Sequence, residues 1–315
     1  IAEVPVSASM PLYIAKEKYL PEMGIELKLN RAVSGSKATA QAATGQIEGI
    51  AGATGASTMN AINQGVGIKG LCDRTRFIPD RQSTLAFLAR SEVYEDGFDL
   101  SDAEGMTWAT NATSSVGHYH VARALKAHGL DWNDIEFKTL PFPQMVSALS
   151  SGAIDITQEV GALVGVAKGK AGAKHVEWCV ETSPETQVAF IQAGAPFLNQ
   201  RPETARKFTE GYLKATRYMY DQGPYSQEMI DIWTKYTDNP PAALLGGVPP
   251  WASRNGTING DSLKRQQEFW MCIGDQDNLV PKKDLIADDI LNDALDNVGR
   301  DDPEFVPLET WEQWQ

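Results

Sequence analysis

The sequence predicts an α/β fold of two similar lobes, each built on a mixed, mostly parallel sheet covered by helices, with two hinge strands between them. Strand-like and helix-like periods alternate through residues 1–72, and the same order of signals returns at 107–157. Two extended apolar runs with no helix attached, 84–89 and 186–192, follow the two halves. Such runs are suited to carry the chain from one lobe to the other.

The first half alternates strands with helices. Its predicted strands are 2–6, 25–29, 47–51 and 68–72, and its predicted helices are 10–20, 37–44 and 58–64. Ser9 is the predicted N-cap of the first helix, which has Pro11 in its first turn, and the other two helices end at Gly45 and Gly65. A series of this kind gives largely parallel pairing, with helices on both faces of the sheet.

The second half repeats this order. Its predicted strands are 107–109, 135–140 and 154–157, and its predicted helices are 115–128 and 144–151. The letters IELK at 25–28 return as IEFK at 135–138, and TGQIE at 44–48 returns as SGAID at 151–155. An internal duplication explains both matches, and two generic strand–helix units remain the alternative.

The chain turns helical after Pro202. Apolar residues there share one helix face: Ala205, Phe208, Tyr212, Ala215 and Met219. Further helices are predicted at 226–236, 261–273 and 285–298. A tail that arrives after the second crossing packs most simply on the first lobe. We therefore predict two Rossmann-like lobes, the first made of 1–86 with 192–315 and the second of 87–191.

Composition and charge exclude several classes of protein. The 315 residues carry 28 Lys and Arg against 41 Asp and Glu, a formal net charge of −13, which argues against nucleic acid as a partner. The longest apolar stretch, 161–167, is too short to cross a bilayer. The cysteines Cys72, Cys179 and Cys272 lie in apolar or aromatic runs and lack metal or redox spacing, so we predict buried free thiols, with one disulfide as the alternative.

Three motifs match known catalytic or cofactor-binding patterns, but the residues around each of them do not fit that function. Residues 65–70 read GVGIKG, but a helix precedes them and a strand follows, the reverse of a dinucleotide-binding loop. Ser34 and Lys37 fit an acyl-serine motif whose partner motifs are missing. His118 and His120 point to different faces of a helix and have no carboxylate at ligand spacing. We therefore predict no catalytic residue, no metal and no cofactor.

Small hydroxyl or glycine residues recur at the turns that enter the helices. These turns hold Ser7 and Ser9, Gly35 and Ser36, 54–57, and 113–115. In a parallel sheet they meet at the carboxyl edge, where free amides and helix dipoles favour an anion. Arg74 and Arg76 follow strand 68–72 at the same edge and suit a bidentate clamp on a carboxylate or sulfonate.

Several short motifs resemble one known family. They are PLYIAK at 11–16, GIEL at 24–27, GQIE at 45–48, the segments 102–107, 124–130 and 148–155, NGTI at 255–258 and QQEFW at 266–270. Over nearly its whole length the chain resembles the periplasmic substrate-binding proteins of ABC importers for nitrate, sulfonates, taurine and thiamine-pyrimidine precursors. The resemblance implies the type II periplasmic-binding fold, in which two lobes close about a hinge onto a ligand.

The resemblance also implies a ligand shell. Carried over by position, it consists of Ser9, Met10, Ser36, Thr54, Ser114, Ser115, Glu159 and Trp251. Val160 stands where the family often has Pro after the acidic residue, and Glu159 would either meet the cationic end of a zwitterion or point away. Trp251 would stack on a flat ring of the ligand or pack in the core.

We therefore predict an extracytoplasmic receptor without catalysis. It would bind a small organic anion or zwitterion, such as a taurine-like sulfonate or an aromatic carboxylate, and deliver it as a monomer to an ABC permease with its ATPase subunits. The sequence begins at Ile1 without Met, which fits either a removed signal peptide in a periplasmic or lipid-anchored protein, or truncation. A pyrimidine ligand, an enzyme of thiamine-pyrimidine or menaquinone-synthesis type on the same fold, and a regulator's sensing domain remain alternatives.

Overall fold

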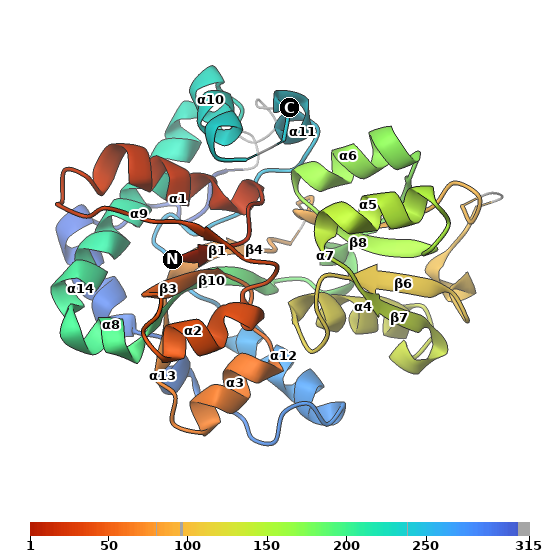
Figure 1. The fold of residues 1–315 in the computed structure, drawn as a ribbon, viewed down its shortest axis with the longest axis horizontal. Coiled ribbons are helices and arrows are strands. Elements are labelled where there is room, and N and C mark those ends of the chain that lie inside the picture. The colour runs from red at the N-terminus through yellow and green to blue at the C-terminus, as the bar shows by residue number, and fades with distance from the viewer. Residues whose placement is uncertain (80, 95–96, 238, 308–315) are drawn as a thin grey trace.

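Two five-stranded sheets lie side by side in the computed structural model, and each forms the centre of one lobe (Figure 1). The structure describes residues 1–79, 81–94, 97–237 and 239–307. The first sheet has the order β2-β1-β3-β10-β4, and the second has the order β7-β6-β8-β5-β9. The predicted two-lobed α/β fold is confirmed.

Both sheets are mixed. The strands of the first are β1 (Ala2–Glu3), β2 (Asn30–Arg31), β3 (Gly49–Gly52), β4 (Ile68–Arg76) and β10 (Gln187–Gly194). Those of the second are β5 (Leu85–Ala89), β6 (Thr107–Thr110), β7 (Glu136–Thr139), β8 (Ile156–Val160) and β9 (Lys174–Trp178). β1 and β6 pair in parallel with both of their neighbours. β10 and β5 run antiparallel to theirs, and each follows a passage of the chain from the other lobe.

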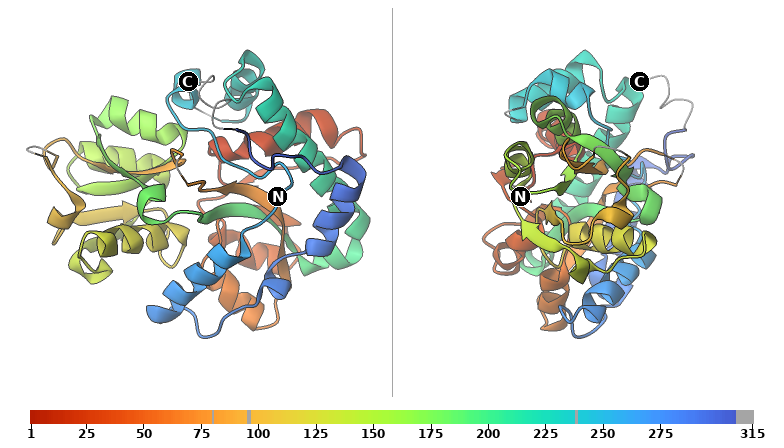
Figure 2. Two further views of the ribbon diagram at one scale, coloured as in Figure 1. Left: turned by 180° about the vertical axis from the view of Figure 1, so that it is seen from behind. Right: turned by 90° about the vertical axis from the view of Figure 1, so that its right-hand side faces the viewer.

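The chain passes between the lobes twice, once between β4 and β5 and once between α7 (Cys179–Thr182) and β10 (Figure 2). β5 continues the first connection and β10 the second, and each strand is a member of one sheet. The division into 1–86 with 192–315 and 87–191 stays a prediction, and its two boundaries fall inside these two strands.

Helices cover both faces of each sheet (Figure 1). On one face of the first sheet lie α1 (Met10–Ile14), which continues as a π-helical turn to Tyr19, α9 (Pro202–Gln222) and α10 (Gln227–Tyr236). On the other lie α2 (Thr39–Ala43), α3 (Ala56–Asn63), α12 (Gly260–Cys272) and α13 (Lys282–Leu285). The remaining helices of this lobe are α8 (Ala195–Gln200), α11 (Pro241–Leu245) and α14 (Asp288–Val298).

The second lobe is smaller. Its sheet carries α4 (Val116–Ala127) and α7 (Cys179–Thr182) on one face, and α5 (Phe142–Ser150) and α6 (Ala162–Ala171) on the other. Trp108 and Phe87 meet edge to face in its core, with ring centroids 4.9 Å apart. Within the described ranges, no helix combines the length and the apolar character that a membrane crossing requires.

Some local predictions were wrong. Residues 25–29 form no strand, and pairing starts one residue later, where Asn30 N donates to Ile1 O at 2.9 Å. α6 and β9 are not among the predicted elements. α6 contains Gly165 and Gly169, and glycine has low helix propensity, so its apolar run carries a weak helix signal.

Candidate functional site

The carboxyl ends of strands from the two sheets face each other across a cavity of about 60 Å³. The first lobe lines it with Ser7, Ser34, Gly35, Arg74 and Thr75 among others. The second lobe lines it with Asn111, Val116, Gly117, Phe142 and Gln158 among others, and the first connection adds Thr84. This edge is where open α/β sheets bind their ligands.

Arg74 is the one charged residue among the described residues that line this cavity. Its side chain is 2% exposed, and burial lowers its pKa. Nε donates to Ala8 O at 3.1 Å and Nη2 donates to Val4 O at 2.9 Å, whereas Nη1 has no partner within the described chain. No described carboxylate contacts the guanidinium directly, so its burial is costly, and an anion in the cavity would relieve part of that cost.

A β-bulge aims Arg74 at the cavity. In the ladder between β10 and β4, Phe190 pairs with Asp73 and the adjacent Ala189 pairs with Thr75, so Arg74 is the extra residue of β4. Such a bulge interrupts the alternation of side chains along a strand. Arg76 points elsewhere: its Nη2 lies 3.9 Å from Glu304 Oε1, and its guanidinium lies over the ring of Phe305.

Ser9 connects Arg74 to a buried counter-charge. Arg74 Nη2 donates to Ser9 Oγ at 2.5 Å, and Ser9 Oγ donates to Glu3 Oε2 at 2.8 Å. Tyr13 OH donates to the same carboxylate at 3.3 Å, and burial raises the pKa of Tyr13. This chain of hydrogen bonds fixes the guanidinium and links it through one hydroxyl to the Glu3 carboxylate, which is not among the described lining of the cavity.

Three hydroxyl groups of the lining have no hydrogen-bond partner among the described residues. They belong to Ser7, Thr75 and Thr84, and all three are buried. Because a hydroxyl rotates freely, each can donate to an acceptor in the cavity. None of the three is among the residues predicted for the site, although Ser7 stands in one of the helix-entering turns described above.

Gln158 presents an amide from the second lobe. Its Nε2 donates to His120 Nδ1 at 3.0 Å, and its Oε1 accepts from Thr110 Oγ1 at 3.3 Å. Burial lowers the pKa of His120 to about 3, so its ring is a neutral acceptor that orients the amide. The second lobe therefore adds neutral polar and aromatic surface, and the first lobe adds the charge.

Glu159 faces away from the cavity. Its neighbours Gln158 and Val160 line the cavity, and successive side chains of a strand point to opposite faces. Its side chain is 0% exposed, and neither carboxyl oxygen has a partner in the described part of the chain. Burial raises the pKa of Glu159 well above its ordinary range, because the side chain is removed from water.

The other predicted site residues lie outside the described lining. Met10 belongs to the core of the first lobe, Thr54 is buried, and Ser36 Oγ lies 3.3 Å from Ser34 Oγ at the rim. Ser115 Oγ donates to Ala112 O at 2.7 Å, and Ser114 Oγ donates across to the first lobe.

Trp251 is a core residue. Its side chain is 2% exposed, and its Nε1 donates to Gln82 O at 2.8 Å. The Arg81 guanidinium lies over its ring, 4.5 Å from the centroid. The structure thus brings Arg74 to the cavity and Ser9 to Arg74, and leaves the remaining predicted residues around it.

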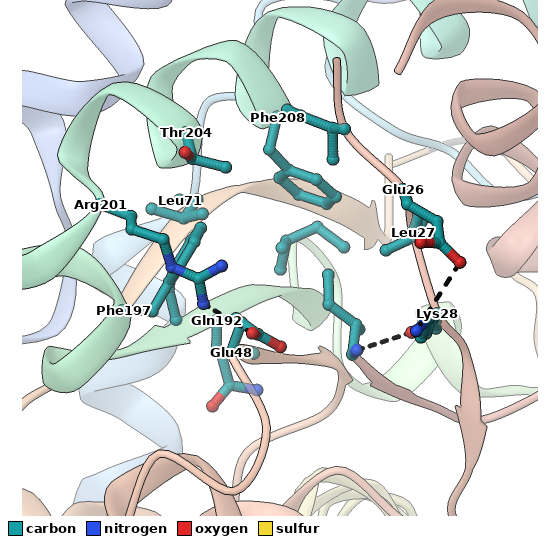
Figure 3. Close-up of a pocket in the computed structure, with 15 residues that line it drawn as sticks. Glu26, Leu27, Lys28, Glu48, Leu71, Gln192, Phe197, Arg201, Thr204 and Phe208 are labelled. Atoms are coloured by element: carbon teal, nitrogen blue, oxygen red, sulfur yellow. Dashed lines mark hydrogen bonds and ion pairs between the residues drawn. The ribbon is translucent and has the colours of Figure 1, made fainter. Parts of the chain in front are cut away.

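A second cavity of about 260 Å³ lies in the first lobe alone (Figure 3). Its charged groups are already engaged: Arg201 Nη2 lies 2.6 Å from Glu48 Oε1, and the Ile1 ammonium donates to Lys28 O at 2.8 Å. The Arg201 guanidinium holds the pKa of Glu48 below its usual value. The interlobe cavity is the better candidate site, because its cation has a free donor and both lobes line it.

The site offers binding groups without an evident nucleophile. All three cysteines are free thiols. Cys72 and Cys179 are buried, and burial raises the pKa of both. The predicted burial of Cys272 was wrong, because it lies at the exposed end of α12. None of the three is among the described residues of the lining. No group of His, Cys, Asp and Glu side chains suited to a metal ion occurs within the described ranges.

Residues 7–224 match the model of the family described as NMT1/THI5 like. The chain belongs to this family. Among proteins with curated descriptions, none matches the sequence.

Three solved structures illustrate the likeness. The periplasmic nitrate-binding protein NrtA of Synechocystis PCC 6803 is 13% identical, with 98% of this chain and 89% of that chain covered and a TM-score of 0.77. The periplasmic aliphatic sulphonate binding protein SsuA of Escherichia coli is 16% identical, with 90% of each chain covered and a TM-score of 0.69. The desulfurization enzyme DSZB is 15% identical, with 95% and 99% covered and a TM-score of 0.66.

Proposed function

We propose that this protein is a solute receptor of an ABC importer that binds a small organic anion between its two lobes. The observation that carries the proposal is Arg74, a buried cation with a free Nη1 on the wall of the interlobe cavity. The likeness to binding proteins for nitrate and aliphatic sulphonate supports it.

The chemistry of the lining favours a compact anion over a zwitterion. Arg74 Nη1 and the hydroxyls of Ser7 and Thr75 are donors that a carboxylate or sulfonate would accept from. No described carboxylate lines the cavity, and Glu159 lies on the other face of β8, so an ammonium group would find no counter-charge there. Phe142 is the one described aromatic residue of the lining, which disfavours a large aromatic ligand.

Closure would couple binding to transport. An anion on Arg74 in the first lobe would also contact Gln158 and Phe142 in the second, and only the closed form offers both sets of contacts. The ligand would shift the population toward that form by its difference in affinity for the two states. We propose that a membrane permease with its ATPase subunits takes the ligand from a monomeric, exported receptor.

A receptor is favoured over an enzyme by the residues at the site. DSZB shares the fold, so catalysis is the second class to test. The described lining of this chain holds neither cysteine nor histidine, and its polar groups are an arginine, hydroxyls and amides. Recovery of the bound compound unchanged after prolonged incubation is expected, and turnover of the compound would identify an enzyme.

The decisive experiment is a calorimetric and thermal-shift panel of methanesulfonate, taurine, benzoate and nitrate. A ligand at 100 times its Kd adds about 2.7 kcal/mol to the unfolding free energy. Arg74→Gln removes hydrogen bonds from a charged donor, worth about 1.5–3 kcal/mol, so affinity should fall roughly 10- to 150-fold.

The matched control is Arg76→Gln, since Arg76 lies two residues along the same strand and points away from the cavity. Its affinity should equal that of the wild type. Arg74→Lys keeps the positive charge but loses the bidentate geometry of the guanidinium. Its ligand affinity should lie between that of Arg74→Gln and that of the wild type. Equal binding by wild type and Arg74→Gln would refute the proposed site.

A further inference from the structure

The two lobes also touch at an edge outside the cavity, where α4 of the second lobe meets α3 and α12 of the first. Ser114 O accepts a hydrogen bond from Ala56 N at 2.8 Å, and Gly55 and Ser115 form an isolated antiparallel bridge. Ser114 Oγ donates to Asp275 Oδ2 at 2.5 Å. None of these residues is among the described lining of the cavity.

Aromatic side chains extend this contact. The ring of Phe269 on α12 meets His118 and Tyr119 of α4 edge to face, with centroids 5.2 Å and 5.8 Å apart. Trp270 Nε1 points at Ser115 O from 3.4 Å. Side chains of one lobe therefore reach over the first turns of a helix in the other.

The first-lobe side of this edge is fixed to its own lobe. Trp270 packs with Phe190 of β10 and Met59 of α3 in one apolar cluster. Asn60 Nδ2 donates to Asp275 O at 2.8 Å, which holds the segment after α12 against α3. The contacts to α4 thus join two bodies and do not brace a single one.

The backbones of the two lobes lie close together where Gly55 meets Ser114. A Cβ on Gly55 would lie 2.5 Å from Ser114 O, so a side chain at this position would separate the two segments. Ser114 itself has φ 51°, in the left-handed region that residues with side chains rarely adopt. The lobe contact therefore depends on a specific local conformation on each side.

We propose that Ser114, Ser115, Phe269 and Asp275 form an interlobe latch that sets ligand affinity by stabilising the closed form without touching the ligand. The inference rests on the proposed receptor function, because closure matters only if a ligand is bound between the lobes. The apparent Kd equals the intrinsic Kd divided by the closed fraction. Weakening the interlobe latch should therefore raise the apparent Kd and shorten the lifetime of the complex.

Hydrogen exchange at the Ala56 amide measures the interlobe latch without any ligand, because the acceptor of that amide lies in the other lobe. The Met59 amide donates to Gly55 O at 3.2 Å within the first lobe and serves as the internal reference. Phe269→Ala removes aromatic pairs worth about 0.5–1.5 kcal/mol, so exchange at Ala56 should accelerate roughly 2- to 12-fold. Exchange at Met59 should not change.

Two variants separate the interlobe latch from a merely structural effect. Met271→Ala changes an exposed side chain of the same helix and should leave exchange at Ala56 unchanged, and Phe269→Tyr keeps the ring and should restore it. Acceleration at Ala56 and Met59 together, or at neither, would overturn the proposal.

The ligand arm uses methanesulfonate and nitrate. For whichever binds the wild type, Phe269→Ala should raise the dissociation rate, because the ligand leaves from the open form and the interlobe latch opposes opening. An unchanged dissociation rate would overturn the link to affinity. If neither anion binds the wild type, the proposed function fails in this form while the exchange data still decide whether the interlobe latch exists.

Discussion

Two of the edges along which the lobes meet are built differently. At the α4–α12 edge, polar and aromatic side chains cross from one lobe to the other. At the α6–α11 edge, glycines provide the contact. A Cβ on Gly165 would lie 3.1 Å from Gly246 O, and a Cβ on Gly247 would lie 2.8 Å from Ala162 N. The α4–α12 edge is stabilised by hydrogen bonds and aromatic contacts. At the α6–α11 edge the backbones approach closely because glycines there have no side chain.

This difference predicts opposite sensitivities. Loss of a side chain at the α4–α12 edge removes one favourable contact and leaves the rest in place. Gain of a side chain at the α6–α11 edge puts atoms against backbone that has no rotamer to change. Deletions should therefore act gradually at the first edge, and additions should block closure at the second.

Gly247→Ala should have the largest effect. The new Cβ would meet Gly161 C and Ala162 N at 2.8 Å and Ala162 Cα at 2.9 Å, all of them backbone atoms. Overpacking of this kind costs roughly 1–3 kcal/mol, and backbone-on-backbone contact places it near 3. If only the closed form bears that cost, the apparent Kd should rise roughly 100-fold, measured by titration calorimetry.

Gly169→Ala is the matched control, because Gly169 lies on α6 and a Cβ there meets nothing within 4 Å. It should bind as the wild type does and melt at an equal or higher temperature. Tight binding by Gly247→Ala would mean that the α6–α11 contact yields, and the contrast between the two edges would disappear.

A substitution of Asp73 tests the stability of the first lobe without changing the contacts between the lobes. Its carboxyl is buried inside the first lobe, where Oδ1 accepts from Gln187 Nε2 at 2.6 Å and Oδ2 accepts from Ser253 N at 2.7 Å. Burial raises its pKa from 3.8 to about 6. The folded state thus holds the proton more tightly than the unfolded chain, and the stability this provides is lost as pH rises through about 6.

The unfolding free energy should therefore contain a term that falls by about 2 kcal/mol between pH 4.5 and pH 7. Urea titrations at both pH values measure it, and the fall should be smaller by that amount in Asp73→Asn. Relative exchange at Ala56 and Met59 should stay the same in this variant, since Asp73 lies at neither edge. An identical pH profile in Asp73→Asn and wild type would contradict the assignment.

The order of strands and helices was predictable from the sequence, because alternating periods and glycine stops are local signals. The antiparallel direction of β5 and β10 was not, since it depends on which lobe the chain has just left. The sequence also carried no sign that residues 25–29 would form no strand. Its apolar residues fit a strand, but the paired part of β1 is only Ala2–Glu3.

The sequence predicted where the candidate site lies and that it suits an anion, but it identified only some of the residues that form it. Arg74 and Arg76 are equivalent by strand period, and the bulge at Arg74 decides which of them lines the cavity. Ser114 and Ser115 stand at the predicted helix start, yet their polar atoms meet the first lobe or their own turn. Both outcomes depend on contacts between distant segments, which period and spacing do not encode.

The smallest predicted effect sharpens the comparison at the attractive edge. Asp275→Ala removes the acceptor of Ser114 Oγ, while Asp275 N and O keep their bonds to Trp270 and Asn60. The pair is partly exposed, so its loss should cost about 1 kcal/mol and speed exchange at Ala56 roughly fivefold. Asp277→Ala, a nearby exposed carboxylate, is the control. If the Ala56 amide exchanges at the same rate in Asp275→Ala and Asp277→Ala, the Ser114–Asp275 hydrogen bond does not stabilise the contact. The backbone and aromatic contacts would then hold the lobes together at this edge.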